Sequence, residues 1–237
     1  MPLSSVRTPL DERANALAGP LNRCGERVLR ILVLYCHNGP ISTLRTATLH
    51  HLQTLNQGAS RHKVLFFNAL TPPPSWFKAI HFDAMVLDTT FLCLRWSPFF
   101  HRWKRYVSWI SDCTCAKIAL PQDEYDHSEI LDEWLNEMRV SALFSCFPAE
   151  TCRVLYPTMH RKATLYKCFT GYIHTSTAER IAGRLLPIKH REKDIVYRAR
   201  HLPYWFGRHG QLKHQIAAAV GSRCARHGLR CDISTRN

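Results

Sequence analysis

The sequence predicts an α/β fold, a Rossmann-like and mostly parallel sheet with helices on both faces. Short, near-continuous apolar runs of strand length recur along the chain, the pattern of strands buried on both faces. Amphipathic segments of helical period separate these runs, and strands that alternate with helices form parallel sheets. A strand–helix–strand pattern near the C-terminus indicates the start of a second sheet.

The first strand is predicted over Leu29–Cys36 and ends at the sequence His37-Asn38-Gly39-Pro40, which breaks the strand and opens a helix. Five further strands are expected over residues 63–68, 83–88, 115–120, 142–147 and 163–169. Among the helices between them, one that opens at Ser97-Pro98 has an expected inner face of four side chains: Phe99, Trp103, Val107 and Ile110. Another is expected to begin at a capping box of Asp126 and Glu129.

The second region begins with a strand at Ile195–Tyr197, followed by two glycines, a helix over Gln211–His227 and a strand over Leu229–Ile233. The predicted organisation is a loose tail over 1–27, a Rossmann-like domain over 28–173, a connector over 174–192 and a strand–helix–strand unit over 193–237. In such units, phosphates bind at the helix N-terminus and ligands at the carboxyl end of the strand.

The chain has 237 residues, 46% of them hydrophobic, and a formal net charge of +14. This composition supports a substantial core, and the charge suits a phosphate-bearing ligand, an anionic membrane surface or nucleic acid. Acidic surface elsewhere in a longer protein is an equally weighted explanation of the charge.

Ten cysteines without an N-terminal apolar signal indicate a reducing compartment, so a cytoplasmic location is expected. Cys113 and Cys115 form a C-x-C motif, but no second pair lies at zinc spacing, and the histidines form no ligand motif. No metal site is therefore predicted, and no bound cofactor is expected.

Several motifs occur in a fixed order: LVLYCHNGP, the pair His50-His51, LPQDEYD, the sequence TGY at 170–172 and DIVYRARHLPYWFGRHGQ. In this order they resemble a group of bacterial glycosyltransferases with the two-domain GT-B fold. The resemblance covers most of Arg30–Ser234, and the last motif is the most specific. The chain departs from the pattern at Ala199, where a glycine is expected. The alanine adds a methyl group at a point where the resemblance implies that the backbone and the donor approach closely.

The resemblance implies an acceptor-binding N-terminal domain, a C-terminal domain that binds a nucleotide-sugar, and transfer without a bound metal. It also implies that the second domain is truncated here, so the chain alone is not expected to be a competent transferase. Peripheral contact with the inner face of an anionic membrane is a further expectation, and nucleic acid is not an expected partner. The sugar, the nucleotide and the acceptor are not specified by the sequence.

Three candidate catalytic residues follow predicted strands: Asp123, Glu124 and His37. A carboxylate at the carboxyl end of a parallel strand can act as a general base if partial burial raises its pKa. For the two acids, capping and solvating the next helix is an equally weighted alternative. For His37, a structural hydrogen-bonding role outweighs the role of base or acceptor contact.

The candidate donor-binding residues all belong to the second region: Tyr197, Arg198, Arg200, Trp205, Gly207 and Gly210. If the chain is extended, the two arginines leave the same face and can donate to a diphosphate. Pairing with surface acids is their alternative role. The cluster Tyr204, Trp205 and Phe206 can stack on a nucleobase or line the cleft, but packing at the domain junction outweighs these roles, and the glycines are expected to shape the backbone.

A binding module without chemistry, for nucleic acid, nucleotide or an anionic surface, is the main competing prediction, because Arg102, Lys104 and Arg105 form a basic helix face. A receiver-like signalling domain is excluded, since His37 and Asn38 occupy the positions after the first strand where that chemistry needs acidic residues.

Overall fold

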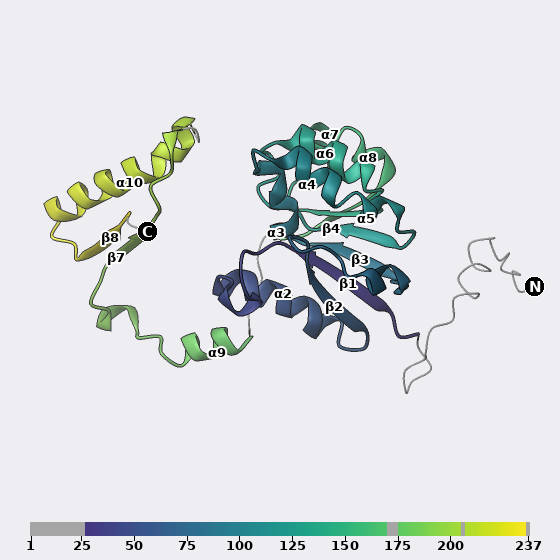
Figure 1. The fold of residues 1–237 in the computed structure, drawn as a ribbon. Helices are drawn as coiled ribbons and strands as arrows, with labels where there is room; N and C mark the ends of the chain where they lie inside the picture. Colours follow the sequence, from purple (N-terminus) through teal and green to yellow (C-terminus); the bar gives the residue numbers. More distant parts are fainter. Residues whose placement is uncertain (1–26, 170–174, 205–206, 236–237) are drawn as a thin grey trace, which may run out of the picture. The chain divides into compact units, whose positions relative to one another are not determined.

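The computed structural model describes residues 27–169, 175–204 and 207–235. The chain divides into two compact units, unit 1 (Met1–Tyr172) and unit 2 (Ile173–Asn237) (Figure 1). Within its described residues, unit 1 is a Rossmann-like α/β domain with a six-stranded, all-parallel sheet in the order β2-β1-β3-β4-β5-β6. The α/β class and the parallel sheet predicted from the sequence are thus confirmed.

The strands of unit 1 lie within the predicted apolar runs and are mostly shorter. They are β1 (Arg30–Tyr35), β2 (Lys63–Asn68), β3 (Ala84–Leu87), β4 (Ala116–Ala119), β5 (Ala142–Ser145) and β6 (Thr164–Lys167). The parallel register sets Ile31 beside both Val64 and Ala84, so β1 lies inside the sheet with a neighbour on each side. Its unbroken apolar sequence follows from this position, because both faces of a central strand are covered.

The helical elements of unit 1 are the 3-10 helices η1 (Ile41–Thr43), η2 (Ser75–Ala79) and η3 (Cys93–Trp96) and the helices α2 (Thr46–Gly58), α3 (Thr89–Leu92), α4 (Phe100–Tyr106), α5 (Trp109–Asp112), α6 (Ser128–Glu137), α7 (Ala149–Leu155) and α8 (Met159–Lys162). In Figure 1, α4, α6, α7 and α8 gather together, and α2 lies apart beside β1 and β2.

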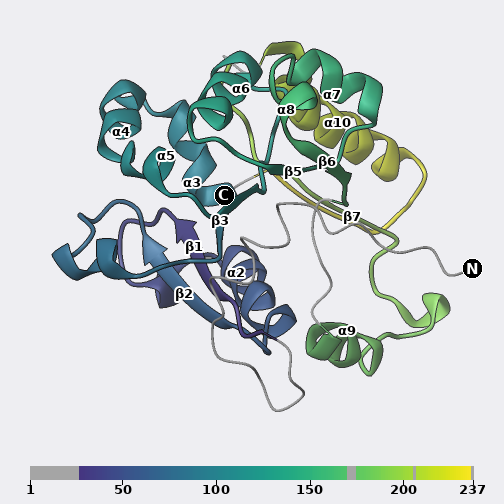
Figure 2. The same cartoon turned by 90° about the vertical axis from the view of Figure 1, so that its right-hand side faces the viewer.

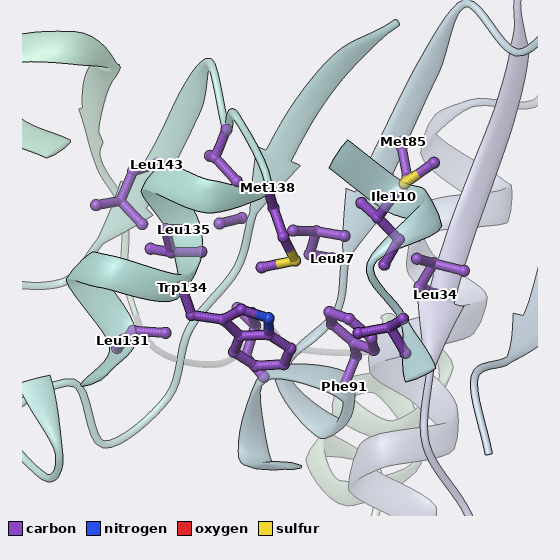
Figure 3. Packing of buried hydrophobic residues seen from close by; sticks show 14 of the residues in the cluster. Leu34, Met85, Leu87, Phe91, Ile110, Leu131, Trp134, Leu135, Met138 and Leu143 are labelled. Carbon is purple, nitrogen blue, oxygen red and sulfur yellow. The ribbon is translucent and has the colours of Figure 1, made fainter. Parts of the chain in front are cut away.

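Hydrophobic packing covers both faces of the sheet. On one face Leu32 and Leu34 of β1 belong to the larger core, to which α6 contributes Trp134. On the other face Val33 packs with Leu52 of α2. Figure 2 shows the sheet from a second side, and Figure 3 shows Leu34, Phe91 and Trp134 close together in the larger core.

Two local predictions for unit 1 are wrong. Phe99 does not face the core but is 54% exposed, because α4 begins only at Phe100, which packs edge-on against Trp134 at a centroid distance of 4.9 Å. The capping box is also absent: α6 follows His127, which has a left-handed backbone (φ 55°), and no side chain caps the helix. Asp126 contacts the His127 ring at 2.8 Å instead.

Unit 2 contains α9 (Thr175–Ala182), η4 (Ile188–His190) and a strand–helix–strand segment of β7 (Ile195–Arg198), α10 (Gly207–Arg226) and β8 (Cys231–Ser234). β7 and β8 pair in parallel. The helix begins four residues earlier than the sequence predicted, so Gly207 and Gly210 lie inside its first turn. Gly228, with φ 64°, follows the helix as predicted for a C-terminal glycine.

Candidate site at the carboxyl edge of the unit 1 sheet

The strand order of unit 1 contains one topological switch point. From β1 the chain crosses to β2 on one side, and β3 then pairs with β1 on the other side. In open parallel sheets, ligands bind beyond the carboxyl ends of the two strands at which the connections diverge. The residues that follow β1 and β3 are therefore the first place to look for chemistry.

The predicted residue His37 follows β1, and its backbone is hydrogen-bonded to Asn68, the last residue of the neighbouring strand β2. Asn68 accepts a hydrogen bond from the His37 N–H at 3.3 Å and donates one to the His37 carbonyl at 2.7 Å. The ring nitrogen Nε2 lies 2.8 Å from Oγ1 of Thr43, whose hydroxyl donates to the Pro40 carbonyl. Because that hydroxyl proton is already used, Nε2 is the nitrogen that donates, and Nδ1 is the acceptor of the neutral ring.

Gly39 allows this loop to close. Its φ of 139° is a conformation that L side chains rarely adopt, and a Cβ there would lie 3.2 Å from Thr43 Oγ1 and 3.7 Å from His37 Nε2. The glycine of the HNGP sequence therefore fits the tight approach of the loop backbone to the imidazole and the hydroxyl.

After β3, Asp88 is a fully buried carboxylate that contacts an imidazole. Its Oδ2 accepts hydrogen bonds from the Thr90 N–H at 2.9 Å and the Thr90 hydroxyl at 2.7 Å. The same hydroxyl accepts from the Cys36 N–H at 3.1 Å, which ties this group to the end of β1. The other oxygen, Oδ1, is buried, has no well-formed hydrogen bond from a described residue, and lies 3.3 Å from Nδ1 of His51.

The His51 side chain is 35% exposed to solvent, whereas the Asp88 side chain is not exposed. The imidazole thus connects a buried anion to the solvent-accessible edge. A carboxylate in this position orients the ring and stabilises the imidazolium that forms when the ring accepts a proton. The sequence indicates neither residue as a base, since His51 occurs there only as part of a motif.

Two thiols near this group are not nucleophiles. Burial, reinforced by Asp88 and Cys93, raises the pKa of Cys36 to about 12. Burial also raises the pKa of Cys93 to about 11, and Asp123 and Asp88 add to the effect. Both thiols stay protonated near neutral pH, and the thiolate is the reactive form.

The loop that follows β4 carries Asp123 and Glu124, and a buried arginine holds it in place. Arg95 is 2% exposed and donates to the carbonyls of Gln122 at 2.7 Å, Asp123 at 3.0 Å and Asp126 at 3.1 Å. Its Nη1 donates to the Leu92 carbonyl at 3.0 Å. Sequence reasoning missed Arg95, since a lone arginine among apolar residues gives no local sign of the carbonyls it will meet.

The structure separates the two acids of this loop. Asp123 is exposed, has a left-handed backbone with φ 48°, and lies near Tyr125, whose pKa it raises. Glu124 is 2% exposed, and its two oxygens accept hydrogen bonds from the Tyr156 hydroxyl at 2.6 Å and the Cys146 N–H at 3.2 Å. Burial and this carboxylate raise the pKa of Tyr156, so the phenol remains a donor. Asp123 is thus the accessible acid, and Glu124 joins the loops that follow β4 and β5.

In unit 2, the predicted Arg198 pairs with an acid. Its guanidinium donates to the carboxylate of Asp232 at 2.5 Å and to the Asp232 carbonyl at 2.8 Å. The N–H groups of Ala199 and His201 continue the pairing beyond β7, so the chain is extended there and the exposed Arg200 leaves the same face as Arg198.

The other predicted donor-binding residues have structural contacts or lie inside the helix. The Tyr197 hydroxyl donates to the Lys213 carbonyl of α10 at 3.0 Å, so this side chain packs on the helix. Consequently Arg198 and Arg200 lie on the sheet face opposite α10. Gly210 is buried in the first turn of α10, and Gly207 there has φ 65°. Trp205 lies outside the described residues.

One hollow of unit 1, about 330 Å³, is far from these chemical groups. Its lining includes Phe82 and Cys115, which precede β3 and β4, so it lies toward the amino-terminal edge of the sheet. The buried carboxylate and the two imidazoles lie at the opposite, carboxyl edge of the sheet.

Neither a family model, nor a curated protein, nor a solved structure matches this chain. In the part of the chain that the structure describes, no group of three or more His, Cys, Asp or Glu side chains is placed to hold a metal ion. No helix there is long and apolar enough to cross a membrane.

Proposed function

We propose that the chain belongs to a glycosyltransferase of GT-B type, which transfers a sugar from a nucleotide-sugar to a hydroxyl acceptor without a bound metal. Unit 1 is the acceptor-side domain and the β7-α10-β8 segment belongs to the donor-side domain. The observation that carries the proposal is the contact of His51 with the buried Asp88 at the β1/β3 switch point. Motif resemblance supplies the reaction class.

The geometry of unit 1 supports a proton acceptor at this edge. The acceptor hydroxyl gives its proton to the His51 imidazole, and Asp88 stabilises the resulting cation. The acceptor oxygen then bonds to the anomeric carbon while the bond from that carbon to the diphosphate oxygen breaks. His37 and Asp123, exposed to different degrees at the same edge, would orient the acceptor in this proposal.

The leaving diphosphate needs positive charge, and unit 2 offers it. Arg198 and Arg200 provide guanidinium groups on one face of β7. On the other face, the first turn of α10 provides N–H groups that have no partner within the helix and the positive end of the helix dipole. Arg198 must exchange its Asp232 partner for the phosphate, which is feasible because this ion pair is exposed.

Donor binding is tested by calorimetric titration of the chain with a panel of nucleotide-sugars at low and moderate salt. We expect weak, salt-sensitive binding that Arg198→Ala with Arg200→Ala abolishes. Arg153→Ala with Arg161→Ala removes the same charge from exposed positions of unit 1 and should preserve it. Absence of binding to every nucleotide-sugar contradicts the proposal and leaves the non-catalytic binding module.

The base is tested on turnover of a labelled donor, in transfer or in hydrolysis, at high protein concentration because the expected rate is low. His51→Gln and Asp88→Asn should each lower turnover by about 10²–10⁴-fold and leave donor affinity unchanged. His127→Gln is the matched control, since His127 also contacts a carboxylate, that of Asp126, but an exposed one. Normal turnover in His51→Gln would instead favour Asp123 or His37 as the base.

A further inference from the structure

A basic surface on α4 remains unused by the proposed chemistry. The short helix carries four basic side chains, His101, Arg102, Lys104 and Arg105, and all but Lys104 are exposed. The sequence contains no acidic residue between Asp88 and Asp112 to neutralise them locally. Such a concentration of one sign of charge attracts an anionic partner.

Two aromatic side chains border this surface and project into solvent. Phe99 is 54% exposed and Tyr106 is 37% exposed. A local turn, in which the Ser97 hydroxyl accepts from the Phe99 N–H at 3.2 Å, presents Phe99 just ahead of the helix. The Tyr106 ring packs edge-on against Trp103 at 5.9 Å, which fixes its position at the other end of α4.

A hollow of about 330 Å³ lies beside these basic groups. Three of its lining residues are the basic side chains His101, Lys104 and Arg105, and Ser108 adds a hydroxyl. The acid in the lining, Glu137, is held by Lys104 at 2.6 Å. Arg105 can therefore face an anionic group that enters the hollow.

The floor of the hollow is apolar. It includes Val107, Trp134 and Met138, each at most 3% exposed. A cationic rim over an apolar floor, with exposed rings beside it, matches the chemistry of an anionic lipid headgroup and the first part of its acyl chains. We propose that α4, with Phe99 and Tyr106, docks unit 1 on an anionic lipid bilayer, whose headgroups contact the basic rim while the two rings enter the interface.

The arrangement of Phe99 favours a bilayer over nucleic acid. The guanidinium carbon of Arg102 lies 5.4 Å from the centroid of the Phe99 ring and covers one face of it. Single-stranded nucleic acid would use such a ring as a flat stacking platform, whereas a membrane interface requires only an exposed apolar edge. The overall charge of +14 adds long-range attraction to an anionic surface. This docking does not depend on sugar transfer.

Vesicle flotation with the full chain tests the docking. Vesicles of phosphatidylcholine alone and of an equal mixture of phosphatidylcholine and phosphatidylserine are compared at low and high salt. We expect binding to the anionic vesicles only, weakened by salt. Arg102→Glu with Arg105→Glu should lower the partition coefficient about 25-fold or more, and Phe99→Ser about tenfold.

The matched control, Arg61→Glu with Arg153→Glu, makes the same change in net charge at exposed arginines outside α4 and should weaken binding much less. Equal weakening by both double variants would overturn the proposal, because general charge would then explain the attraction. The proposal is also overturned if anionic vesicles do not bind, or if Phe99→Ser has no effect. Binding of a single-stranded oligonucleotide at low salt would also contradict the proposal, if this binding requires Arg102 and Arg105 and displaces the vesicles.

Discussion

The central strand β1 of unit 1 and the strand β7 of unit 2 show two ways of holding a parallel strand. In β1, Leu32, Val33 and Leu34 are completely buried between two hydrophobic clusters. In β7, Val196 is 59% exposed, because α10 covers only the face that carries Tyr197. The apolar residues of a parallel strand are therefore buried on both faces in unit 1 and on only one face in unit 2.

Unit 2 depends more on polar contacts at its surface. Arg230 donates to both carboxylate oxygens of Asp194 at one end of the β7–β8 pair, at 3.1 and 3.2 Å. Arg198 donates to Asp232 in the strand itself. Exposed ion pairs contribute little to stability compared with buried apolar groups. The comparison shows that a strand–helix–strand segment can form the same local geometry while it buries a much smaller share of its apolar residues.

The largest expected consequence is in hydrogen exchange. Amides of Ile31–Tyr35 should exchange only through global unfolding of unit 1, whereas those of Ile195–Arg198 should exchange through local opening of unit 2. We expect roughly hundredfold or greater protection of the β1 amides, because local opening energies are well below the global value. Mass-spectrometric exchange of the full chain measures both segments at once, and equal protection of β1 and β7 would contradict the comparison.

A pair of core substitutions sharpens the comparison at a smaller scale. Trp134 is 1% exposed and contacts the rings of Phe91 and Phe100, so Trp134→Ala should lower the stability of unit 1 by about 3–5 kcal/mol. Val196→Ala, at an exposed position of β7, should change stability by less than about 0.5 kcal/mol. Denaturant unfolding followed by circular dichroism tests both. A mild effect of Trp134→Ala would show that the larger core repacks around the cavity.

The sequence predicted the strands well and the edges of the helices less well. Uninterrupted apolar residues predicted both the mostly buried central strand β1 and the edge strand β2, and β2 has the predicted bounds. The position of Phe99 could not be predicted from helical spacing, because Phe100, one residue later, takes the core position. The strand order was also beyond the sequence, since it depends on pairings between distant segments such as Lys63 and Arg30.

The candidate site was predicted in part. The sequence indicated the carboxyl edge of the sheet and the residues His37 and Asp123, because strand ends can be located from apolar runs. It did not separate Asp123 from Glu124, whose burial depends on Tyr156, 32 residues away. The approach of His51 to Asp88 likewise depends on how α2 packs on the sheet. Tertiary packing, rather than local pattern, decides which side chains meet.

The smallest expected effect is the pH dependence of unit 2. Hydrogen bonds from the Arg230 side chain and backbone lower the pKa of Asp194, and a hydrogen bond from Arg198 lowers the pKa of Asp232. An acid whose pKa is lower in the folded state stabilises that state above its unfolded pKa, and this contribution is lost as pH falls through the folded pKa.

The unfolded value for Asp is about 3.9, so the contribution should be complete above about pH 5 and decrease below about pH 4. Exchange of the β7 amides, corrected for the intrinsic rate at each pH, should therefore show less protection near about pH 3 than near about pH 5. Because both ion pairs are exposed, the change should be modest and should shrink further in high salt. The variant Asp194→Asn with Asp232→Asn removes both titrating groups and should lose this added dependence. If the variant and the unchanged chain respond equally to acid, the two arginine–aspartate pairs do not hold the β7–β8 segment together.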